Sequence, residues 1–480
     1  MKELLLIFLP LAGSIVALSW PSERTRPQLL PAVSLVHSVL AIWLLLDPPV
    51  VAPGAWLGFD PLARAILPAV SILFFVCSAY AVPYLRTRPE RPNRVFVSVL
   101  LAMLGLMSAA HQARHLGLLW IATEALTFAA VPLIHFSGTS RAFEATWKYL
   151  LIGGTGIALS LLGSFCLGYA SVKGGGSGDL TFAALMAQGR ALSGPWVLIA
   201  WVLLLVGYGT KMGLAPMHTW KPDVYGEAPG IVGAILAGCV TTVAFTALLR
   251  VRAVVDAAGY GATAGRTLLV IGLFSMFVAA LFLLGTRDFK RMLAYSSVEH
   301  MGILVIGAAL GRVGVWAALF HVWNNGFIKG TLFLSAGNIR RAAGARTIDE
   351  VSGMSAITPR SAAIFVTAML AATACPPFGP FFSELLIVRT AFATGHGASA
   401  GIFLVCLLFA FFGMTRLVFA IVDGRPCAAA RLGGRRFGET AGVILPPLAL
   451  LGLSLWLGLA TPAVLRDSWA AAAEQIFPVL

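Results

Sequence analysis

Residues 196–220 read WVLIAWVLLLVGYGTKMGLAPMHTW. The first eleven of these residues are apolar, Lys211 follows at a depth from which its side chain cannot easily reach water, and Gly213 to Pro216 interrupt the helix. A helix needs about 20 mostly apolar residues to cross a hydrocarbon core of roughly 30 Å. The stretch therefore predicts a transmembrane helix that breaks inside the membrane next to an ionisable side chain.

The rest of the chain has the same apolar character. Of its 480 residues, 59% are hydrophobic and 11% are charged, whereas about 25% of residues are charged in soluble domains. The mean hydropathy is +0.88. Apolar runs long enough to span a membrane recur without the alternation of barrel strands. We predict an all-α integral membrane protein with about fourteen transmembrane helices, two of them interrupted.

The expected spans follow from the apolar runs and the residues that separate them. They lie near residues 4–20, 28–46, 62–82, 95–111, 115–136, 147–170, 196–228, 230–251, 265–285, 291–311, 313–337, 360–393, 398–422 and 440–461. We expect the first to be a span and not a cleaved signal peptide, because no small-residue cleavage site precedes Pro21. The seventh and twelfth exceed one span and contain breakers, at 213–216 and 375–380.

The two interrupted helices are five helices apart, which predicts two inverted five-helix repeats of the kind found in ion transporters. The expected segments are an N-terminal three-helix segment (1–93), a first repeat with its break near 213–216 (94–252), a second repeat with its break near 375–380 (264–422) and a C-terminal helix (438–480). Both breaks should line a polar cavity, because broken backbone is not tolerated against lipid.

The basic residues predict the orientation. Roughly twenty Lys and Arg fall in the odd-numbered loops and about ten in the even loops and termini, so the positive-inside rule places the odd loops in the cytoplasm. These loops include Arg86 to Arg94 and Arg425 to Arg436. We expect a prokaryotic cytoplasmic membrane protein with both termini outside. The net charge of +14 follows from this topology and does not indicate nucleic acid as a partner.

The sequence lacks the motifs that hold cofactors or metals. The six cysteines stand singly, and there is no C-x-x-C pair, P-loop, dinucleotide fingerprint or H-E-x-x-H motif. We therefore expect no cofactor, no metal and no redox chemistry in this chain, which must take its energy from a gradient or a partner.

Four ionisable residues lie deep inside predicted spans. They are Glu124, Lys211, Lys329 and Glu384, the last just after the second break. A charge at the bilayer centre costs a few kcal/mol, so such residues usually mark ion pathways. Burial disfavours the charged form of acids and bases alike, which helps buried groups exchange protons near neutral pH. We predict a proton route in which an ion pair between Glu124 and Lys211 forms and breaks; the alternative is a set of buried structural ion pairs.

Further polar residues near these four are candidate relays. They are His218, Glu299, His300 and His321. An imidazole can relay protons near neutral pH. The alternative for each histidine is an ordinary packing residue.

Long motifs resemble a known family. They are KMGLAPMHTWKPDVYGEAP (211–229), RDFKRMLAYSSVEHMG (287–302), the segment 321–329 and PFGPFFSE (377–384). Together they resemble the antiporter-like proton-translocating subunits of respiratory complex I, group 4 hydrogenases and multisubunit cation/proton antiporters, and SSVEHMG is most similar to hydrogenase-4 component F. The resemblance covers about residues 60–440.

The resemblance implies roles for individual residues. Glu124 matches the helix-five glutamate, Lys211 the helix-seven lysine, Lys329 the helix-eleven lysine and Glu384 the helix-twelve charge. Thr242 departs from the pattern, because many relatives carry a second lysine or a histidine there. A hydroxyl cannot hold a mobile proton at neutral pH, so Thr242 is only a candidate relay, and transfer between the lysines would need water or histidine at this point.

The resemblance implies a proton-translocating subunit of a multisubunit redox complex, a group 4 nickel–iron hydrogenase or a complex-I-like oxidoreductase. Its partners would be the other membrane subunits and the hydrophilic subunits of that complex, and the transported ion would be the proton or sodium. Three alternatives stay open: a cation/proton antiporter subunit without a redox partner, a non-pumping scaffold, and a subunit of a complex-I-related system for solute or inorganic-carbon uptake.

Overall fold

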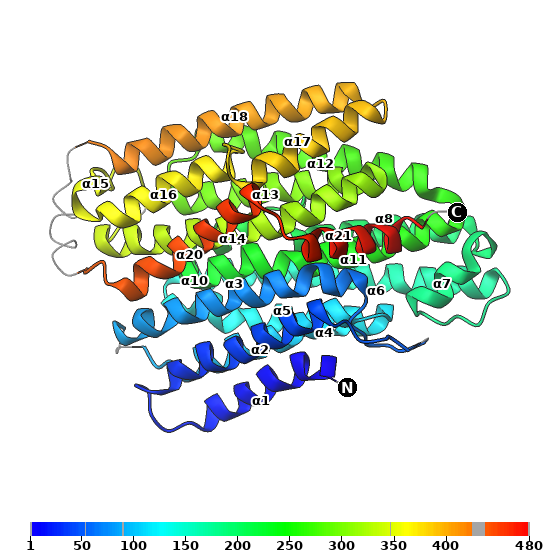
Figure 1. Ribbon diagram of the computed structural model, residues 1–480, viewed down its shortest axis with the longest axis horizontal. Helices are drawn as coiled ribbons and strands as arrows, with labels where there is room; N and C mark the ends of the chain where they lie inside the picture. Colours follow the sequence, from blue (N-terminus) through cyan, green and yellow to red (C-terminus); the bar gives the residue numbers. More distant parts are fainter. Residues whose placement is uncertain (1, 53, 89–90, 346, 425–436, 479–480) are drawn as a thin grey trace.

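The computed structural model describes residues 2–52, 54–88, 91–345, 347–424 and 437–478. Within these ranges the chain forms helices and no β-strand, only three isolated bridges. The long helices run side by side along the long axis of the molecule, with α1 at one edge of the bundle and α18 at the other (Figure 1). The chain is thus all-helical, as predicted.

The helices have the following bounds. The longer ones are α1 (Leu5–Ser19), α2 (Leu29–Leu46), α3 (Pro61–Arg86), α4 (Arg94–Gln112), α5 (Leu116–Ile134), α6 (Ser140–Lys173), α8 (Gly194–Met212), α11 (Thr241–Val255), α12 (Gly261–Gly285), α13 (Phe289–Ala309), α14 (Gly311–Ala343), α18 (Gly397–Val422) and α20 (Ala441–Leu459). The shorter ones are α7 (Phe182–Gln188), α9 (Trp220–Glu227), α10 (Gly230–Ile235), α15 (Met354–Ile357), α16 (Pro359–Ala372), α17 (Gly379–Ala393) and α21 (Ala463–Ile476). A π-helical turn, Leu236–Val240, joins α10 to α11.

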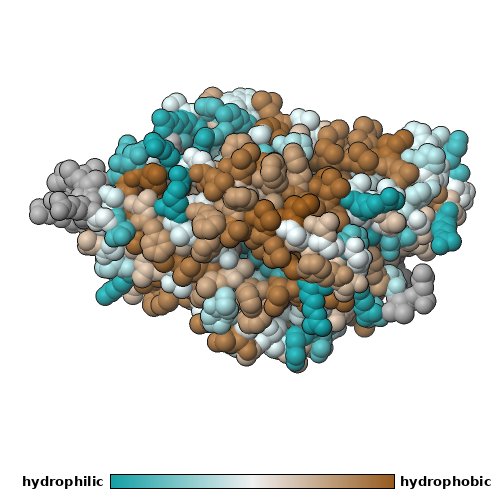
Figure 2. Space-filling model, turned by 90° about the horizontal axis from the view of Figure 1, so that it is seen from above, coloured by the Kyte–Doolittle hydropathy of each residue, from teal (hydrophilic) through white to brown (hydrophobic). Residues whose placement is uncertain are grey.

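Eleven helical stretches in the described residues are long and apolar enough to cross a membrane. They are Lys2–Ser19, Arg26–Leu46, Pro61–Arg86, Arg94–Gln112, Leu116–Ser137, Ser140–Lys173, Gly194–Met212, Gly230–Gly285, Phe289–Ala309, Gly397–Val422 and Ala441–Leu459. On the face shown in Figure 2, apolar side chains cover most of the middle, and many hydrophilic ones lie toward the ends and along one edge. This is the surface of a multi-pass membrane protein.

Helix α14 is not among these stretches, although it lies at the centre of the bundle. Every residue from Ala317 to Ala336 is buried, and α14 packs against α3, α10, α13, α16, α17 and α20. Because other helices surround it, α14 needs no apolar face toward lipid and can carry polar residues such as Asn324 and Lys329.

Both predicted interruptions are present. Helix α8 ends at Met212, Gly213 takes the left-handed backbone conformation at φ +80°, and α9 begins at Trp220. Helix α16 ends at Ala372 and α17 begins at Gly379. After the first break, α9 packs on α6 and α13, and α10 packs on α14. The broken segment therefore joins the two halves of the chain.

The basic loops gather at one end of the bundle, which we call the basic end. Its arginines and Lys290 line three neighbouring cavities. Arg24, Arg86, Arg88 and Arg91 line one, Arg88, Lys290, Arg340 and Arg341 line the second, and Arg141, Arg287 and Arg291 line the third. The predicted basic loop at 425–436 lies outside the described residues.

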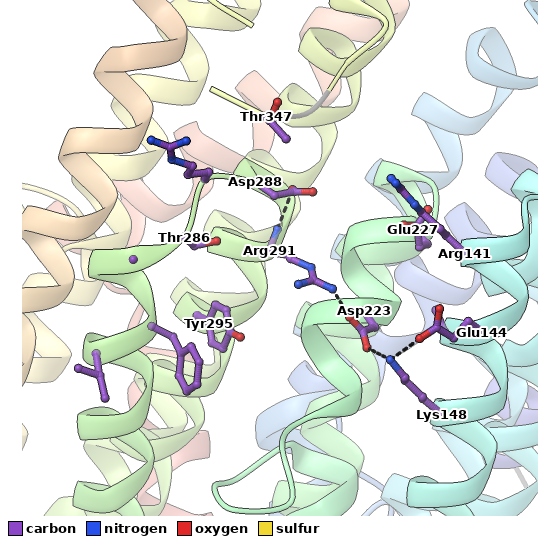
Figure 3. Close-up of a pocket in the computed structure, with 15 residues that line it drawn as sticks. Arg141, Glu144, Lys148, Asp223, Glu227, Thr286, Asp288, Arg291, Tyr295 and Thr347 are labelled. Atoms are coloured by element: carbon purple, nitrogen blue, oxygen red, sulfur yellow. Dashed lines mark hydrogen bonds and ion pairs between the residues drawn. The ribbon is translucent and has the colours of Figure 1, made fainter. Parts of the chain in front are cut away.

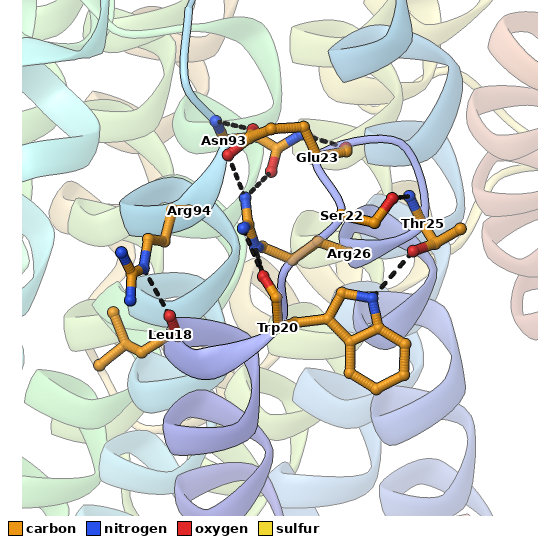
Figure 4. A network of polar contacts seen from close by, with 8 residues as sticks. All are labelled: Leu18, Trp20, Ser22, Glu23, Thr25, Arg26, Asn93 and Arg94. Carbon is orange, nitrogen blue, oxygen red and sulfur yellow. Dashed lines mark hydrogen bonds and ion pairs between the residues drawn. The ribbon is translucent and has the colours of Figure 1, made fainter.

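A polar network fixes the first loop at this end (Figure 4). Arg26 pairs with Glu23 and donates to Asn93 Oδ1 at 2.8 Å, and the Asn93 backbone N–H donates to Glu23 at 2.9 Å. Burial alone would raise the pKa of Glu23, but the Asn93 N–H and the Arg26 guanidinium lower it below its ordinary value. The network ties the loop between α1 and α2 to the start of α4.

Candidate functional site

Lys211 is held by hydroxyl groups. It lies near the end of α8 with 2% of its surface exposed. Its ammonium group donates to Thr127 Oγ1 on α5 at 2.6 Å and to Tyr149 OH on α6 at 2.7 Å. The nitrogen also lies 4.5 Å from the centroid of the Tyr149 ring, a distance that allows a cation–π contact. Lys211 thus joins α5, α6 and α8 at the first break.

Glu124 lies near this contact but not in it. It precedes Thr127 by one helical turn, so both lie on the same face of α5. Its Oε2 atom is buried without a hydrogen-bond partner. No carboxylate of the described residues forms an ion pair with Lys211 within 4.0 Å. The predicted ion pair between Glu124 and Lys211 is therefore not formed in this structure. The Lys211 ammonium group contacts the Thr127 hydroxyl instead.

Lys329 has a similar environment in the second half of the chain. It is fully buried on α14 and donates to Ser296 Oγ on α13 at 2.6 Å. Glu299 is also buried and follows Ser296 by one turn of α13. Both buried lysines of the predicted route are thus held by hydroxyl groups.

Two of the three predicted relay histidines contact each other. His300 Nδ1 lies 3.0 Å from His321 Nε2, and His321 Nδ1 lies 2.8 Å from Ser383 Oγ. The next residue, Glu384, is 2% exposed, and neither of its carboxylate oxygens has a hydrogen-bond partner. The sequence places these residues on α13, α14 and α17, and the fold brings them together beside the second break.

This cluster is also the one group among the described residues with three potential metal ligands close together. One ligand atom from each of His300, His321 and Glu384 lies within 4.8 Å of the others. A metal ion would need a free ring nitrogen from each imidazole at about 2.0–2.1 Å. Because both ring nitrogens of His321 are engaged, one by His300 and one by Ser383, the arrangement fits a hydrogen-bonded relay better than a metal centre.

Thr242 lies next to a histidine that the sequence analysis did not single out. His111, buried on α4, has Nε2 3.1 Å from Thr242 Oγ1 and Nδ1 2.9 Å from Thr246 Oγ1. His111 is the last residue of the predicted fourth span, where the sequence alone suggests a residue at the membrane surface. Its contact with Thr242 becomes apparent only from the packing of α4 on α11. An imidazole can hold a proton near neutral pH, and that of His111 lies beside Thr242, whose hydroxyl cannot.

His218 lies in the first break, apart from the other histidines. It is 7% exposed and packs near the rings of Phe282 and Tyr295, with Nδ1 buried and without a hydrogen-bond partner. Tyr295 and Phe282 line the largest cavity at the basic end. His218 therefore lies between this cavity and the interior.

That cavity, of about 900 Å³, is lined by charged residues from both halves of the chain (Figure 3). At its centre Asp223 of α9 accepts a hydrogen bond from Lys148 at 2.8 Å and pairs with Arg291 of α13. Lys148 also pairs with Glu144 at 2.6 Å. Two residues before Asp223, Lys221 points to the interior and is fully buried. Lys221 lies within the predicted span 196–228, but the sequence analysis did not single it out because Pro222 and Asp223, directly after it, interrupt the apolar run.

Comparison with known proteins places these features in a family. Residues 113–410 match the family described as NADH:quinone oxidoreductase/Mrp antiporter, TM. The chain is 31% identical over 405 residues to a protein named hydrogenase-4 component F homolog from Methylacidiphilum infernorum, covering 82% of this chain and 84% of that protein.

Two further similarities agree with this match. The chain is 32% identical over 416 residues to NADH-quinone oxidoreductase subunit N of Desulforudis audaxviator, covering 84% and 81% of the two chains. Its fold matches a chain in the structure of the Mrp complex from Dietzia sp. DQ12-45-1b with a TM-score of 0.88, at 22% identity and with 99% and 97% coverage. The chain belongs to the NADH:quinone oxidoreductase/Mrp antiporter family and is one of its antiporter-like membrane subunits.

Proposed function

We propose that this chain translocates protons as the membrane subunit of a group 4 hydrogenase or a complex-I-like oxidoreductase. Glu124, Lys211, Lys329 and Glu384 carry the protons, and His218, Thr242, Glu299, His300 and His321 assist as relays. Electron transfer takes place in partner subunits. The names of the hydrogenase-4 and NADH-quinone oxidoreductase relatives support this type of complex.

The observation that carries the proposal is how Lys211 and Lys329 are held. Each is buried and contacts hydroxyl groups at 2.6–2.7 Å. A carboxylate partner would fix the charge of a lysine, whereas a hydroxyl can accept from an ammonium group and donate to a neutral amine. Both protonation states therefore keep a hydrogen bond, as a site that takes up and releases protons requires.

We further propose fourteen spans, with residues 94–252 and 264–422 as inverted repeats, the basic end in the cytoplasm and both termini outside. The two breaks, at 213–219 and 373–378, lie in corresponding places of these segments. The cavity around Asp223 then opens to the cytoplasm and supplies protons to the interior.

Cysteine labelling tests the orientation. Thr87 at the basic end and Ser177 in the loop before α7 are both exposed. In a chain with Cys375 and Cys427 replaced by serine, we expect an impermeant maleimide to label Ser177→Cys in intact cells and Thr87→Cys only after permeabilisation. Strong labelling of Thr87→Cys in intact cells would contradict the proposed orientation.

Proton uptake by inverted membrane vesicles tests the function itself. Vesicles from the native host are given hydrogen, formate or NADH in separate assays, or a sodium gradient without a donor, and a pH-sensitive dye reports uptake. We expect uptake driven by one electron donor that is lost when this chain is deleted. Uptake that depends on the chain but requires only the sodium gradient would replace the redox proposal by antiport. Donor-driven uptake that survives deletion of this chain would contradict proton translocation by it and favour a non-pumping scaffold.

A further inference from the structure

Lys221 is a fully buried lysine that the route described above does not use. It lies in the second position of α9, between the first break and the cavity around Asp223. Its ammonium nitrogen donates to Ser297 Oγ on α13 at 3.1 Å. No Asp or Glu of the described residues forms an ion pair with it within 4.0 Å. An ammonium group buried without a carboxylate is costly, so its presence requires a reason.

The surroundings of Lys221 suit a cation that is not permanently charged. The side chain lies against the first break: a Cβ at Gly213 would be 2.3 Å from Lys221 Cε and 2.9 Å from Nζ. The carboxyl end of α8, which carries partial negative charge, is therefore close to the amine. The Tyr225 ring centroid lies 5.8 Å from Nζ. Partial charges and a π-face stabilise an ammonium group, but less firmly than a carboxylate would.

Ser297 is also the sequence neighbour of the serine that holds Lys329. The hydroxyl that holds Lys221 is on Ser297, and the one that holds Lys329 is on Ser296. These serines are neighbours on α13, so the two lysines approach the same helix at consecutive residues. A serine hydroxyl both accepts and donates, and it can pass a proton on by exchanging its own.

Lys221 is connected to Lys211 on its other side. Lys211 donates to Tyr149, whose ring meets the ring of Trp220 edge-on at a centroid distance of 5.3 Å. Trp220 directly precedes Lys221, and its Nε1 donates to the Thr210 carbonyl, the residue before Lys211. The short helix α9 thus holds Lys221 between the lysine of the first half and the lysine of the second.

We propose that Lys221 is a proton carrier between Lys211 and Lys329, an inference that rests on the proposed function. The Lys211 ammonium group gives a proton to the neutral amine of Lys221. The resulting ammonium group then gives a proton to the Ser297 hydroxyl, which releases its own proton toward a neutral Lys329, held by Ser296. In each transfer one N–H bond breaks and one forms, the relaying hydroxyl exchanges one O–H bond for another, and nothing is oxidised or reduced.

Three substitutions at one position test this role in the assembled complex. Lys221→Met removes the proton-carrying group. Lys221→Arg keeps the positive charge and the ability to donate to Ser297, but a guanidinium does not release its proton. Lys221→His keeps an exchangeable proton, held only at lower pH. Lys173→Met, at the exposed last position of α6, is the matched control.

We expect the methionine and arginine variants to lose proton uptake by about a hundredfold or more, the lower end of the usual contribution of a proton-transfer group. The histidine variant should retain a measurable rate, with its pH profile shifted toward acid. Assembly is checked by native gel. A purely structural role predicts the opposite ranking, with Lys221→Arg active and Lys221→His as impaired as Lys221→Met.

Full uptake by an assembled Lys221→Met or Lys221→Arg complex would overturn the role of Lys221. Lys211→Met and Lys329→Met are measured in the same vesicles to separate this failure from failure of the proposed function. If these two lose uptake while Lys221→Met keeps it, only Lys221 is excluded. If all three keep it, the proton route itself is wrong. Should Lys221→Met not assemble, the arginine and histidine variants decide.

Discussion

Lys211→Met should abolish proton uptake by inverted vesicles while the complex still assembles. Methionine is close to lysine in length and apolar, so it can fill the buried space between α5, α6 and α8 but cannot carry a proton. Lys211→Arg should fail as well, because its guanidinium stays protonated. The expected loss is at least about a hundredfold, the lower end of the usual contribution of an acid–base group.

The measurement is dye-reported uptake with the electron donor that supports the wild type, with Lys173→Met as the control. Glu124→Gln should be impaired too, because it removes the charge that can switch Lys211. If the residues only hold helices together, the double variant Glu124→Gln/Lys211→Met should behave as the wild type, since neutral packing often replaces buried ions without loss. Full uptake by an assembled Lys211→Met complex would remove this residue from the route.

Arg250→Met should produce the largest loss of stability. Arg250 and Asp60 form a buried ion pair with two contacts, at 2.5 and 3.0 Å, and both side chains are at most 5% exposed. Arg250 also donates to the His111 carbonyl at 2.9 Å. Removing the arginine leaves a buried carboxylate with no cation, which costs about 3–5 kcal/mol.

Thermal unfolding of the purified chain in detergent measures this effect. Arg312→Met is the control, because Arg312 pairs with Glu474 at 3.2 Å on the surface, where the two side chains are 42% and 56% exposed. Exposed pairs contribute about 0–1 kcal/mol, so this variant should unfold near the wild-type temperature. The double variant Asp60→Asn/Arg250→Met should recover part of the loss. Equal unfolding temperatures for Arg250→Met and Arg312→Met would contradict the prediction.

The Asp60–Arg250 pair also has a place in the architecture. Asp60 caps α3 by accepting from the Ala63 N–H at 2.9 Å, and it accepts from Gln475 of α21 at 2.9 Å. Arg250, the partner of Asp60, donates to the carbonyl of His111 on α4. One buried charge pair thus joins α3, α4, α11 and α21 at the end opposite the basic one, next to the histidine that contacts Thr242.

Features that depend on local composition can be predicted from the amino-acid sequence alone. Long apolar runs, the break after Met212 and the break after Ala372 are readable because a bilayer selects helices by length and hydropathy over consecutive residues. Deep charges such as Lys211 and Glu384 are visible for the same reason: apolar neighbours on both sides leave them no route to water. Both side chains are 2% exposed in the structure.

The groups that these buried charges contact become known from the packing of the helices. Lys211 contacts Thr127, 84 positions away, and Lys221 contacts Ser297, 76 positions away, whereas the expected contact of Lys211 with Glu124 is open. Lys221 and His111 were overlooked because one is followed by Pro222 and Asp223 and the other ends a predicted span, where a local reading does not distinguish a buried side chain from one that reaches water. They are buried because α9 packs on α13 and α4 on α11. The partner of a side chain depends on how distant helices pack, and that information is not contained in any local stretch of the chain.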